Sequence, residues 1–143
     1  MTERSPDHIA GLLPERLREE ATAARAHAYC PYSNYRVGAA LETETGEVFQ
    51  GCNVENASYP AGTCAERVAL GSAVAAGFRR FRRVVIATDA QDPAPPCGIC
   101  RQALVEFAPA LEVFAISGTG TVVRWSLTDL LPVPFTPASL ENA

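Results

Sequence analysis

Three cysteines stand where two predicted helices begin. Cys97 and Cys100 form a C-x-x-C pair directly after Pro96, and Cys64 directly precedes an alanine-rich segment. The unpaired backbone N–H groups and the dipole at a helix start favour thiolate over thiol. Because helices that follow neighbouring parallel strands begin at the same edge of a sheet, we expect the three sulfur atoms to converge.

A zinc ion suits such a cluster, since zinc is borderline-soft, tetrahedral and without redox activity. Three protein ligands leave a fourth position for water, which implies catalysis, and we expect one Zn²⁺ per chain. Glu66 follows Cys64 by two residues, close enough to face that position as a general acid and base without being a ligand. Three thiolates leave the site with a net negative charge, for which Arg67 is the candidate compensating residue.

Other interpretations of the cysteines remain open. A thioredoxin-like redox motif is the main rival for the C-x-x-C pair, but such motifs follow the first strand of a βαβ unit, whereas this pair comes late in the chain. A closed structural zinc site would take Cys30 or Cys52 as its fourth ligand, although their apolar and strand contexts favour small core residues. A zinc-stabilised binding module without turnover would have no need of Glu66.

Length and composition narrow the class of protein. With 143 residues, 48% of them apolar, the chain predicts a single domain over 1–143, with 1–13 as a mobile N-terminal extension. A net charge of −4 argues against a nucleic-acid partner, and the cluster of Arg79, Arg80, Arg82 and Arg83 is interpreted as a solvated turn. No run approaches the ~20 apolar residues of a membrane span. Five cysteines without a signal peptide indicate a reducing, cytoplasmic location.

All twelve basic residues are arginine, so the chain has no lysine with which to form a Schiff base. This excludes pyridoxal-phosphate and class I aldolase chemistry.

Periodicity and turn residues predict the element order α, β, β, α, β, α, β, β, followed by a last short helix that Thr128 caps. This order describes an α/β fold of three layers, α/β/α, around a mixed five-stranded sheet. The expected helices cover about 14–29, 65–76, 97–107 and 129–131, and the expected strands cover 35–43, 48–54, 84–88, 111–116 and 122–126. The tail beyond is rich in proline and is expected to be extended.

The residues around the cysteines resemble the motifs of the cytidine deaminases, specifically the small homotetrameric type with three cysteine zinc ligands. The likeness covers the chain from about the first helix to the tail, in the order and spacing of that family. The matching segments are Cys64 to Arg67, Pro96 to Gln102, Tyr32 to Leu41, Gly51 to Pro60, and Leu130, Leu131, Pro132 and Phe135. The wider zinc deaminase superfamily has His or Cys as the first ligand.

This resemblance implies hydrolytic deamination of cytidine and 2′-deoxycytidine to uridine and 2′-deoxyuridine, with release of ammonia, in pyrimidine salvage. Glu66 would relay protons from water to N3 of the base and to the leaving amine. Asn53, Val54 and Glu55 would bind the nucleoside, with Asn53 and Glu55 on the ribose 3′-hydroxyl. The backbone N–H of Ala65 would bind the O2 oxygen of the base.

The resemblance also implies an assembly. Phe135 would reach the site of a neighbouring subunit of a homotetramer, and Ala57 and Tyr59 would contribute across an interface. Tyr35 departs from the family, which usually has phenylalanine where this tyrosine is expected to pack against the nucleoside. The partners implied are a small-molecule nucleoside and copies of the chain, with no nucleic acid and no membrane. The leading alternative is a deaminase of another aminopyrimidine nucleoside, such as blasticidin S.

Overall fold

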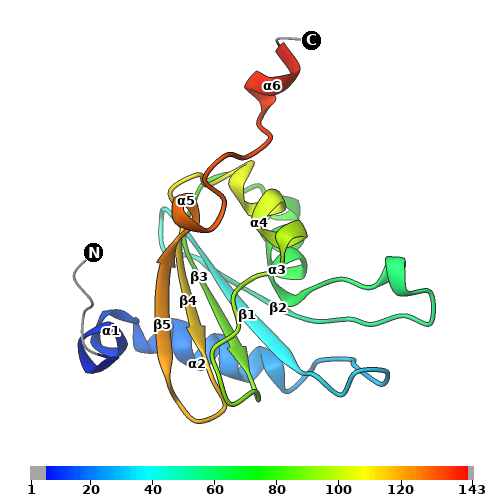
Figure 1. Ribbon diagram of the computed structural model, residues 1–143, viewed down its shortest axis with the longest axis vertical. Coiled ribbons are helices and arrows are strands. Elements are labelled where there is room, and N and C mark those ends of the chain that lie inside the picture. The colour runs from blue at the N-terminus through cyan, green and yellow to red at the C-terminus, as the bar shows by residue number, and fades with distance from the viewer. Residues whose placement is uncertain (1–5, 142–143) are drawn as a thin grey trace.

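A mixed five-stranded sheet forms the centre of the protein, in the strand order β2-β1-β3-β4-β5. The computed structural model describes residues 6–141, with the side chains of residues 6–8 left out (Figure 1). The described strands pair antiparallel except β3 and β4, which run parallel. Their bounds are β1 (Val37–Thr43), β2 (Val48–Cys52), β3 (Phe81–Thr88), β4 (Glu112–Ile116) and β5 (Val122–Ser126).

Helices cover both faces of this sheet, so the predicted three-layer α/β/α class is confirmed. Helices α3 (Ala65–Ala75), α4 (Gly98–Val105) and α5 (Leu127–Leu130) contribute to the core on one face. Helix α2 (Glu15–Arg25) covers the other face, and Ile9 and Ala10 of α1 (Pro6–Leu12) pack beside it. A one-turn helix η1 (Tyr59–Ala61) lies in the loop after β2, and α6 (Pro137–Glu141) ends a tail that projects from the body in Figure 1.

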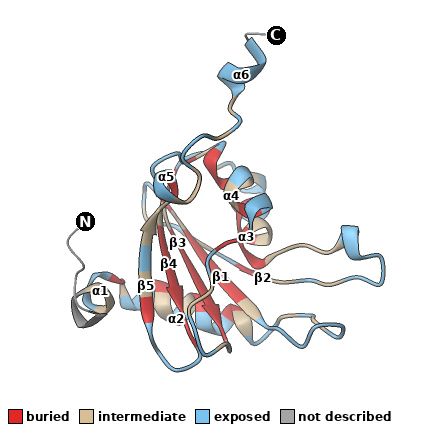
Figure 2. Cartoon of the chain, in the orientation of Figure 1, coloured by how far each residue is buried: buried red, intermediate tan, exposed pale blue. Residues whose placement is uncertain are grey.

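The alternation of side chains along the strands divides the core into two layers. On β1, Ala39 and Leu41 face the α3 side, whereas Ala40 faces α2. The central strand β3 alternates in the same way, and its residues 84–88 are all buried, as the red part of this strand in Figure 2 shows. A strand with helices over both faces is therefore apolar throughout its centre, which is why the run 84–88 was recognisable in the sequence.

Several predicted boundaries were wrong. Helix α2 ends at Arg25 rather than near residue 29, and β2 ends at Cys52, beyond which Val54 forms only isolated bridges. Thr128 does not cap α5: Ser126 holds the N-cap position, and the Thr128 hydroxyl donates to the Pro109 carbonyl at 3.1 Å. The predicted extension 1–13 includes α1 and the 6% exposed Leu13, while its first five residues lie outside the described part of the chain.

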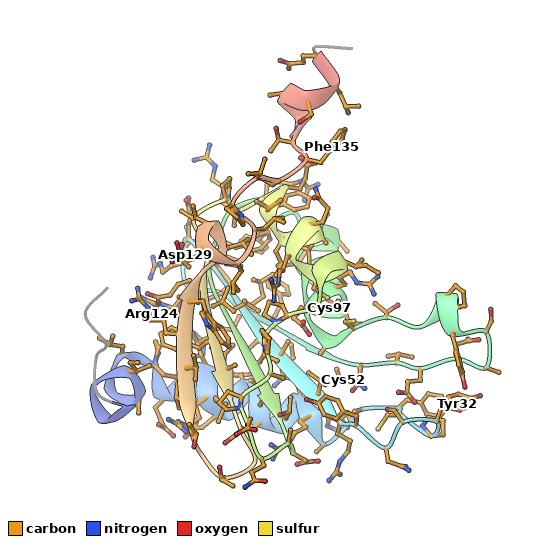
Figure 3. The ribbon with its side chains drawn as sticks, in the orientation of Figure 1. Tyr32, Cys52, Cys97, Arg124, Asp129 and Phe135 are labelled. Atoms are coloured by element: carbon orange, nitrogen blue, oxygen red, sulfur yellow. The ribbon has the colours of Figure 1, made fainter. Side chains whose placement is uncertain are left out.

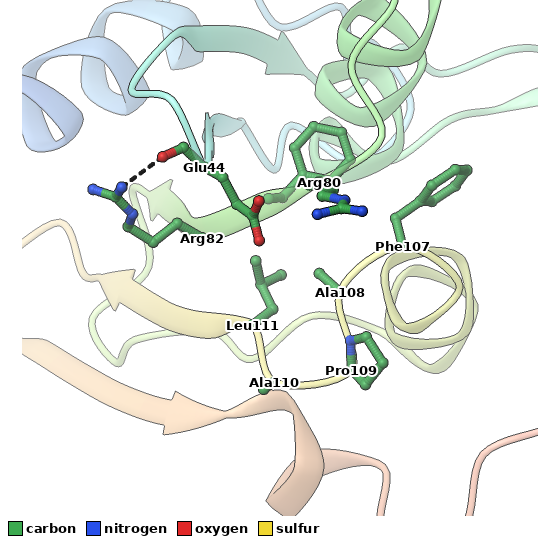
Figure 4. Close-up of a pocket in the computed structure, with 9 residues that line it drawn as sticks. Glu44, Arg80, Arg82, Phe107, Ala108, Pro109, Ala110 and Leu111 are labelled. Atoms are coloured by element: carbon green, nitrogen blue, oxygen red, sulfur yellow. Dashed lines mark hydrogen bonds between the residues drawn. The ribbon is translucent and has the colours of Figure 1, made fainter.

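Of the four clustered arginines, Arg79, Arg80 and Arg82 are exposed as expected, but Arg82 and Arg83 belong to β3 rather than to a turn. Arg79 donates to two backbone carbonyls, Arg82 donates to the Glu44 carbonyl, and Arg83 pairs with Glu42 and Glu112. A cavity of about 740 Å³ lies beside them, lined in part by Glu44, Arg80 and Arg82 (Figure 4). Within residues 6–141, the helices are too short or too polar for any of them to cross a membrane.

Gly51 sets the distance between β2 and α3. A Cβ atom added there would lie 2.2 Å from the Ala65 oxygen and 2.5 Å from the Ala69 nitrogen, so α3 rests directly on the strand backbone. We expect Gly51→Ala to push α3 outward and to lower the free energy of unfolding by about 1–3 kcal/mol. Urea denaturation measures this.

The matched control is Gly71→Ala, within α3. A Cβ atom at Gly71 meets nothing within 4 Å, and a helix gains roughly 0.5–1 kcal/mol from this change. Equal free energies of unfolding for Gly51→Ala and Gly71→Ala would show that a Cβ atom at position 51 does not destabilise the protein.

Candidate active site

Two helix starts bring the three cysteines together. Cys64 occupies the N-cap position of α3, and Cys97 occupies that of α4, with Cys100 in the first turn. The strands that precede these helices, β2 and β3, run parallel to each other but are not neighbours, because the antiparallel β1 lies between them. The predicted convergence therefore occurs across β1 and not between adjacent strands.

The geometry of the cysteine cluster fits zinc. The Sγ atoms of Cys64, Cys97 and Cys100 all lie within 4.8 Å of one another, and the Cys64 and Cys97 sulfurs are 3.7 Å apart. Two sulfurs at the usual distance of about 2.3 Å from a tetrahedral zinc are about 3.8 Å apart, so little movement is needed to bind the ion. Cys100 is buried and Cys97 is exposed, which leaves one side of the cluster open to a small molecule.

Arg67 places a positive charge beside the cysteine cluster. Its Nη2 atom donates to the Cys64 Sγ at 3.6 Å, and its buried Nε has no hydrogen-bond partner among the described residues. Hydrogen bonding from Cys100, then from Arg67, lowers the pKa of Cys64 to about 5, while its bond with Cys64 raises the pKa of Cys100. The cluster thus carries a thiolate at neutral pH, which attracts a cation.

Glu66 is placed beside this cluster. Its side chain is buried, with the residue only 5% exposed, and it lines a cavity of about 390 Å³ together with Cys64 and Cys97. Burial raises the pKa of its carboxyl, and the neighbouring Cys64 charge raises it further. A carboxyl group with a raised pKa is well suited to both accept and return a proton near neutral pH.

Two polar residues on the segment after β2 line the same cavity. Asn53 accepts from the Val37 nitrogen at 2.9 Å and donates to the Tyr35 carbonyl at 2.7 Å. Glu55 accepts hydrogen bonds from the backbone of Tyr32 and from Ser33. Both side chains therefore anchor the segment before β1 as well as facing the cavity.

Sequence reasoning missed part of this lining. The full set of lining residues is Ser33, Tyr35, Val37, Asn53, Glu55, Cys64, Ala65, Glu66, Ile86, Thr88, Ala94, Pro95 and Cys97. Ala94 and Pro95 belong to the proline-rich stretch before Cys97. Because this stretch leads directly to a predicted metal ligand, it could have been predicted to form a wall of the cavity. Ser33 lies in the segment Tyr32 to Leu41 that resembles the family, but neither Ser33 nor Thr88 was singled out as a site residue.

Four of the predicted substrate-binding residues lie outside this cavity lining. Among the described residues, Val54, Ala57, Tyr59 and Phe135 are not part of the cavity lining. Tyr59 is 76% exposed and meets Tyr32 edge to face, at 6.0 Å between ring centroids. Phe135 is 59% exposed on the projecting tail, well away from Cys97 in Figure 3.

The two remaining cysteines are not ligands in this geometry. Cys30 and Cys52 lie outside the cluster of three sulfurs. Both are of intermediate exposure rather than fully buried, so their interpretation as core residues was wrong. Cys30 follows the isolated bridge of Tyr29 with Val54, and Cys52 is the last residue of β2, so both lie at the margin of the regular sheet.

Comparison with known proteins gives a consistent result. A family model described as "cytidine and deoxycytidylate deaminase zinc-binding region" matches residues 13–116. A cytidine deaminase of Sporosarcina psychrophila is 39% identical over 130 residues, covering 90% of this chain and 96% of that protein. The crystal structure of cytidine deaminase from Burkholderia pseudomallei has 50% sequence identity and a TM-score of 0.83, covering 87% of this chain and 100% of that one.

A relative whose name gives a different substrate has a lower sequence identity to this chain than the cytidine deaminase of Sporosarcina psychrophila. A blasticidin-S deaminase of Bacillus cereus is 32% identical over 112 residues, covering 73% of this chain and 79% of that protein.

Proposed function

The chain belongs to the family of the cytidine and deoxycytidylate deaminase zinc-binding region, and we propose that it deaminates cytidine and 2′-deoxycytidine hydrolytically. The reaction consumes one water and releases ammonia, leaving uridine or 2′-deoxyuridine. The observation that carries this proposal is the buried Glu66 carboxyl in one cavity with the metal-binding cysteines and with the polar side chains of Asn53 and Glu55.

Cys64, Cys97 and Cys100 would hold one Zn²⁺ per chain. When bound, zinc supplies Lewis acidity that makes water a stronger acid at neutral pH. Arg67 offsets the excess negative charge of three thiolates through its hydrogen bond to Cys64.

Glu66 performs the proton transfers in this proposal. Its carboxylate accepts a proton from the water that attacks C4 of the pyrimidine, and it delivers this proton to N3. It then transfers the second proton of that water to the exocyclic amine, which leaves as ammonia. Burial supports this use, because a carboxyl with a raised pKa both takes and returns protons readily.

The surrounding residues would orient the nucleoside. The N–H of Ala65 lies in the first turn of α3, where backbone donors lack helical partners, and it would bind the O2 oxygen of the base. Asn53 and Glu55 would bind the ribose 3′-hydroxyl, and Tyr35 would pack against the nucleoside. Val54, between Asn53 and Glu55 in sequence, would contribute through its backbone.

The direct test is turnover with a panel of substrates. Loss of ultraviolet absorbance should be measured with cytidine, 2′-deoxycytidine, deoxycytidine monophosphate, cytosine and blasticidin S. We expect kcat/KM to be highest for the two free nucleosides. A higher value for the monophosphate or for cytosine would contradict the assignment.

Blasticidin S is the second candidate substrate, and the likeness to the Bacillus cereus enzyme favours its inclusion. Asn53 and Glu55 in the cavity lining support a ribose ligand instead. A higher kcat/KM for blasticidin S than for cytidine would identify blasticidin S as the preferred substrate.

A homotetramer would complete the site. The Phe135 carbonyl accepts a hydrogen bond from Gln102 of α4 at 2.8 Å, but its side chain is exposed on the proline-rich tail. Ala57 and Tyr59 lie on an exposed loop, so these three side chains are accessible to another copy of the chain. An aromatic group from a neighbour would close the cavity over a flat base and exclude water.

Phe135→Ala tests this assembly. We expect the variant to stay folded and tetrameric while KM for cytidine rises about tenfold, because the lid of the neighbouring site is lost. A Phe135 that plugged its own core would instead cost roughly 3–5 kcal/mol on truncation. Leu140→Ala is the matched control, since Leu140 is similarly exposed on the same tail.

Mixing the Phe135→Ala chain with a Glu66→Gln chain provides a second readout. A mixed oligomer can pair an intact Glu66 with an intact Phe135 of its neighbour, so part of the activity should return. A wild-type chain that sediments as a fully active monomer would refute the shared site.

The cellular setting follows from the same features. We propose a cytoplasmic enzyme of pyrimidine salvage that acts on small molecules and not on nucleic acids. Its free cysteines suit a reducing compartment, and its net charge of −4 disfavours binding to a phosphate backbone.

A further inference from the structure

Ser33 connects two walls of the substrate cavity. Its backbone N–H donates to Oε1 of Glu55 at 3.1 Å, and its hydroxyl donates to Oε2 of the same carboxylate. The hydroxyl oxygen in turn accepts from the Tyr35 nitrogen at 3.0 Å. One serine therefore joins the Glu55 carboxylate to the backbone of Tyr35, and all three residues line the cavity.

The chain around Ser33 is folded tightly about this carboxylate. The Tyr32 nitrogen also donates to Glu55 Oε1, at 3.0 Å. Asn34 adopts a left-handed conformation, with φ of 57°, and its nitrogen donates to the Cys30 carbonyl at 2.9 Å. Asparagine tolerates this conformation better than most residues. The turn thus presents two backbone donors and one hydroxyl to a single acidic group.

Glu55 is consequently held in one orientation. Hydrogen bonding from Ser33 is the largest of the influences that lower the pKa of this carboxyl, so it is ionised at neutral pH. Oε1 accepts from the backbone nitrogens of Tyr32 and Ser33, whereas Oε2 accepts, among the described residues, only from the Ser33 hydroxyl and retains acceptor capacity for a ligand. A carboxylate already fixed in place binds a ligand hydroxyl without first losing rotational freedom.

We propose that Ser33 is a positioning residue for recognition of the nucleoside sugar, acting through Glu55 and Tyr35. This rests on the proposed function, in which Glu55 accepts a hydrogen bond from the ribose 3′-hydroxyl. Ser33 and Glu55 also line the neighbouring cavity of about 340 Å³, so this hydrogen-bonded pair lies between the two cavities.

The test compares Ser33→Ala with Ser33→Thr, a variant that keeps the hydroxyl at this exposed position. The control is Ser72→Ala, which removes a serine hydroxyl from the exposed face of α3. Steady-state kinetics are measured with cytidine and with 3′-deoxycytidine, and the dissociation constant of uridine is measured by calorimetry. We expect Ser33→Ala to raise KM for cytidine and the uridine dissociation constant about fivefold, with kcat within twofold of wild type. Ser33→Thr and Ser72→Ala should match wild type.

With 3′-deoxycytidine, Ser33→Ala and wild type should have equal KM, because the hydroxyl that Glu55 would accept from is missing. An equal rise in KM for both substrates would overturn the proposal, as would wild-type KM values in Ser33→Ala. Unfolding of Ser33→Ala would also overturn it, since the serine would then serve the fold. Wild-type protein that neither turns over cytidine nor binds uridine would instead refute the proposed function itself.

Discussion

Glu66→Gln is expected to lower kcat for cytidine by at least a hundredfold while the protein keeps its zinc and its fold. Glutamine has nearly the same shape as glutamate, so the buried position beside the cysteines stays filled. An amide, however, accepts no proton from water and returns none to N3 or to the leaving amine. The chemical step loses its acid and base, whereas substrate binding through Asn53 and Glu55 is retained.

Single-turnover kinetics and zinc content, measured on the same preparation, separate these effects. Glu106→Gln, at an exposed position at the end of α4, is the matched control and should behave like wild type. Activity of Glu66→Gln within tenfold of wild type would show that another group shuttles the protons.

Cys97→Ala should abolish both zinc binding and turnover. Cys97 is exposed, so truncation of its side chain removes little packing, and any loss of stability is attributable to the metal. Metal binding is coupled to folding, and two remaining thiolates form a far weaker zinc site than three. We expect less than about a tenth of an equivalent of zinc and a melting temperature lowered by several degrees. Atomic spectroscopy and thermal unfolding provide these values.

Cys30→Ala and Cys52→Ala are the matched controls, because both cysteines lie outside the cluster. Each should retain one zinc. Loss of zinc from Cys52→Ala would mean that the ligands are misassigned. Treatment of wild type with a strong chelator should lower its melting temperature to that of Cys97→Ala, and a chelator without effect would contradict a zinc contribution to stability.

The elements around the sheet were predictable because local pattern and tertiary burial agree there. The apolar run of β3 reflects packing on both faces of the sheet, and the alanine-rich sequence of α3 reflects its close packing against β2. Helix and strand ends were less predictable. Arg25 ends α2 and donates to the Thr88 carbonyl, a contact 63 residues away in sequence that no local signal reports.

The chemistry of the site was more predictable than its supporting contacts. Three cysteines at two helix starts, with Glu66 two residues after the first of them, form a pattern that few functions other than metal-dependent hydrolysis require. The hydrogen bonds of Ser33 with Glu55 and of Asn53 with the Tyr35 carbonyl join residues distant in sequence, so only the folded chain brings them together. The position of β1 between β2 and β3, the strands that precede the cysteine-bearing helices, is set by the strand order of the sheet and has no local signal in the sequence.

Zinc content and cytidine turnover of the same purified protein test the central claim most directly. The protein should contain one zinc per chain, the absorbance of cytidine should fall as uridine forms, and activity should rise in proportion to zinc as metal-free protein is reconstituted. Full activity with much less than one zinc per chain would contradict the mechanism, because Glu66 would then act without the ion that the three cysteines are placed to hold.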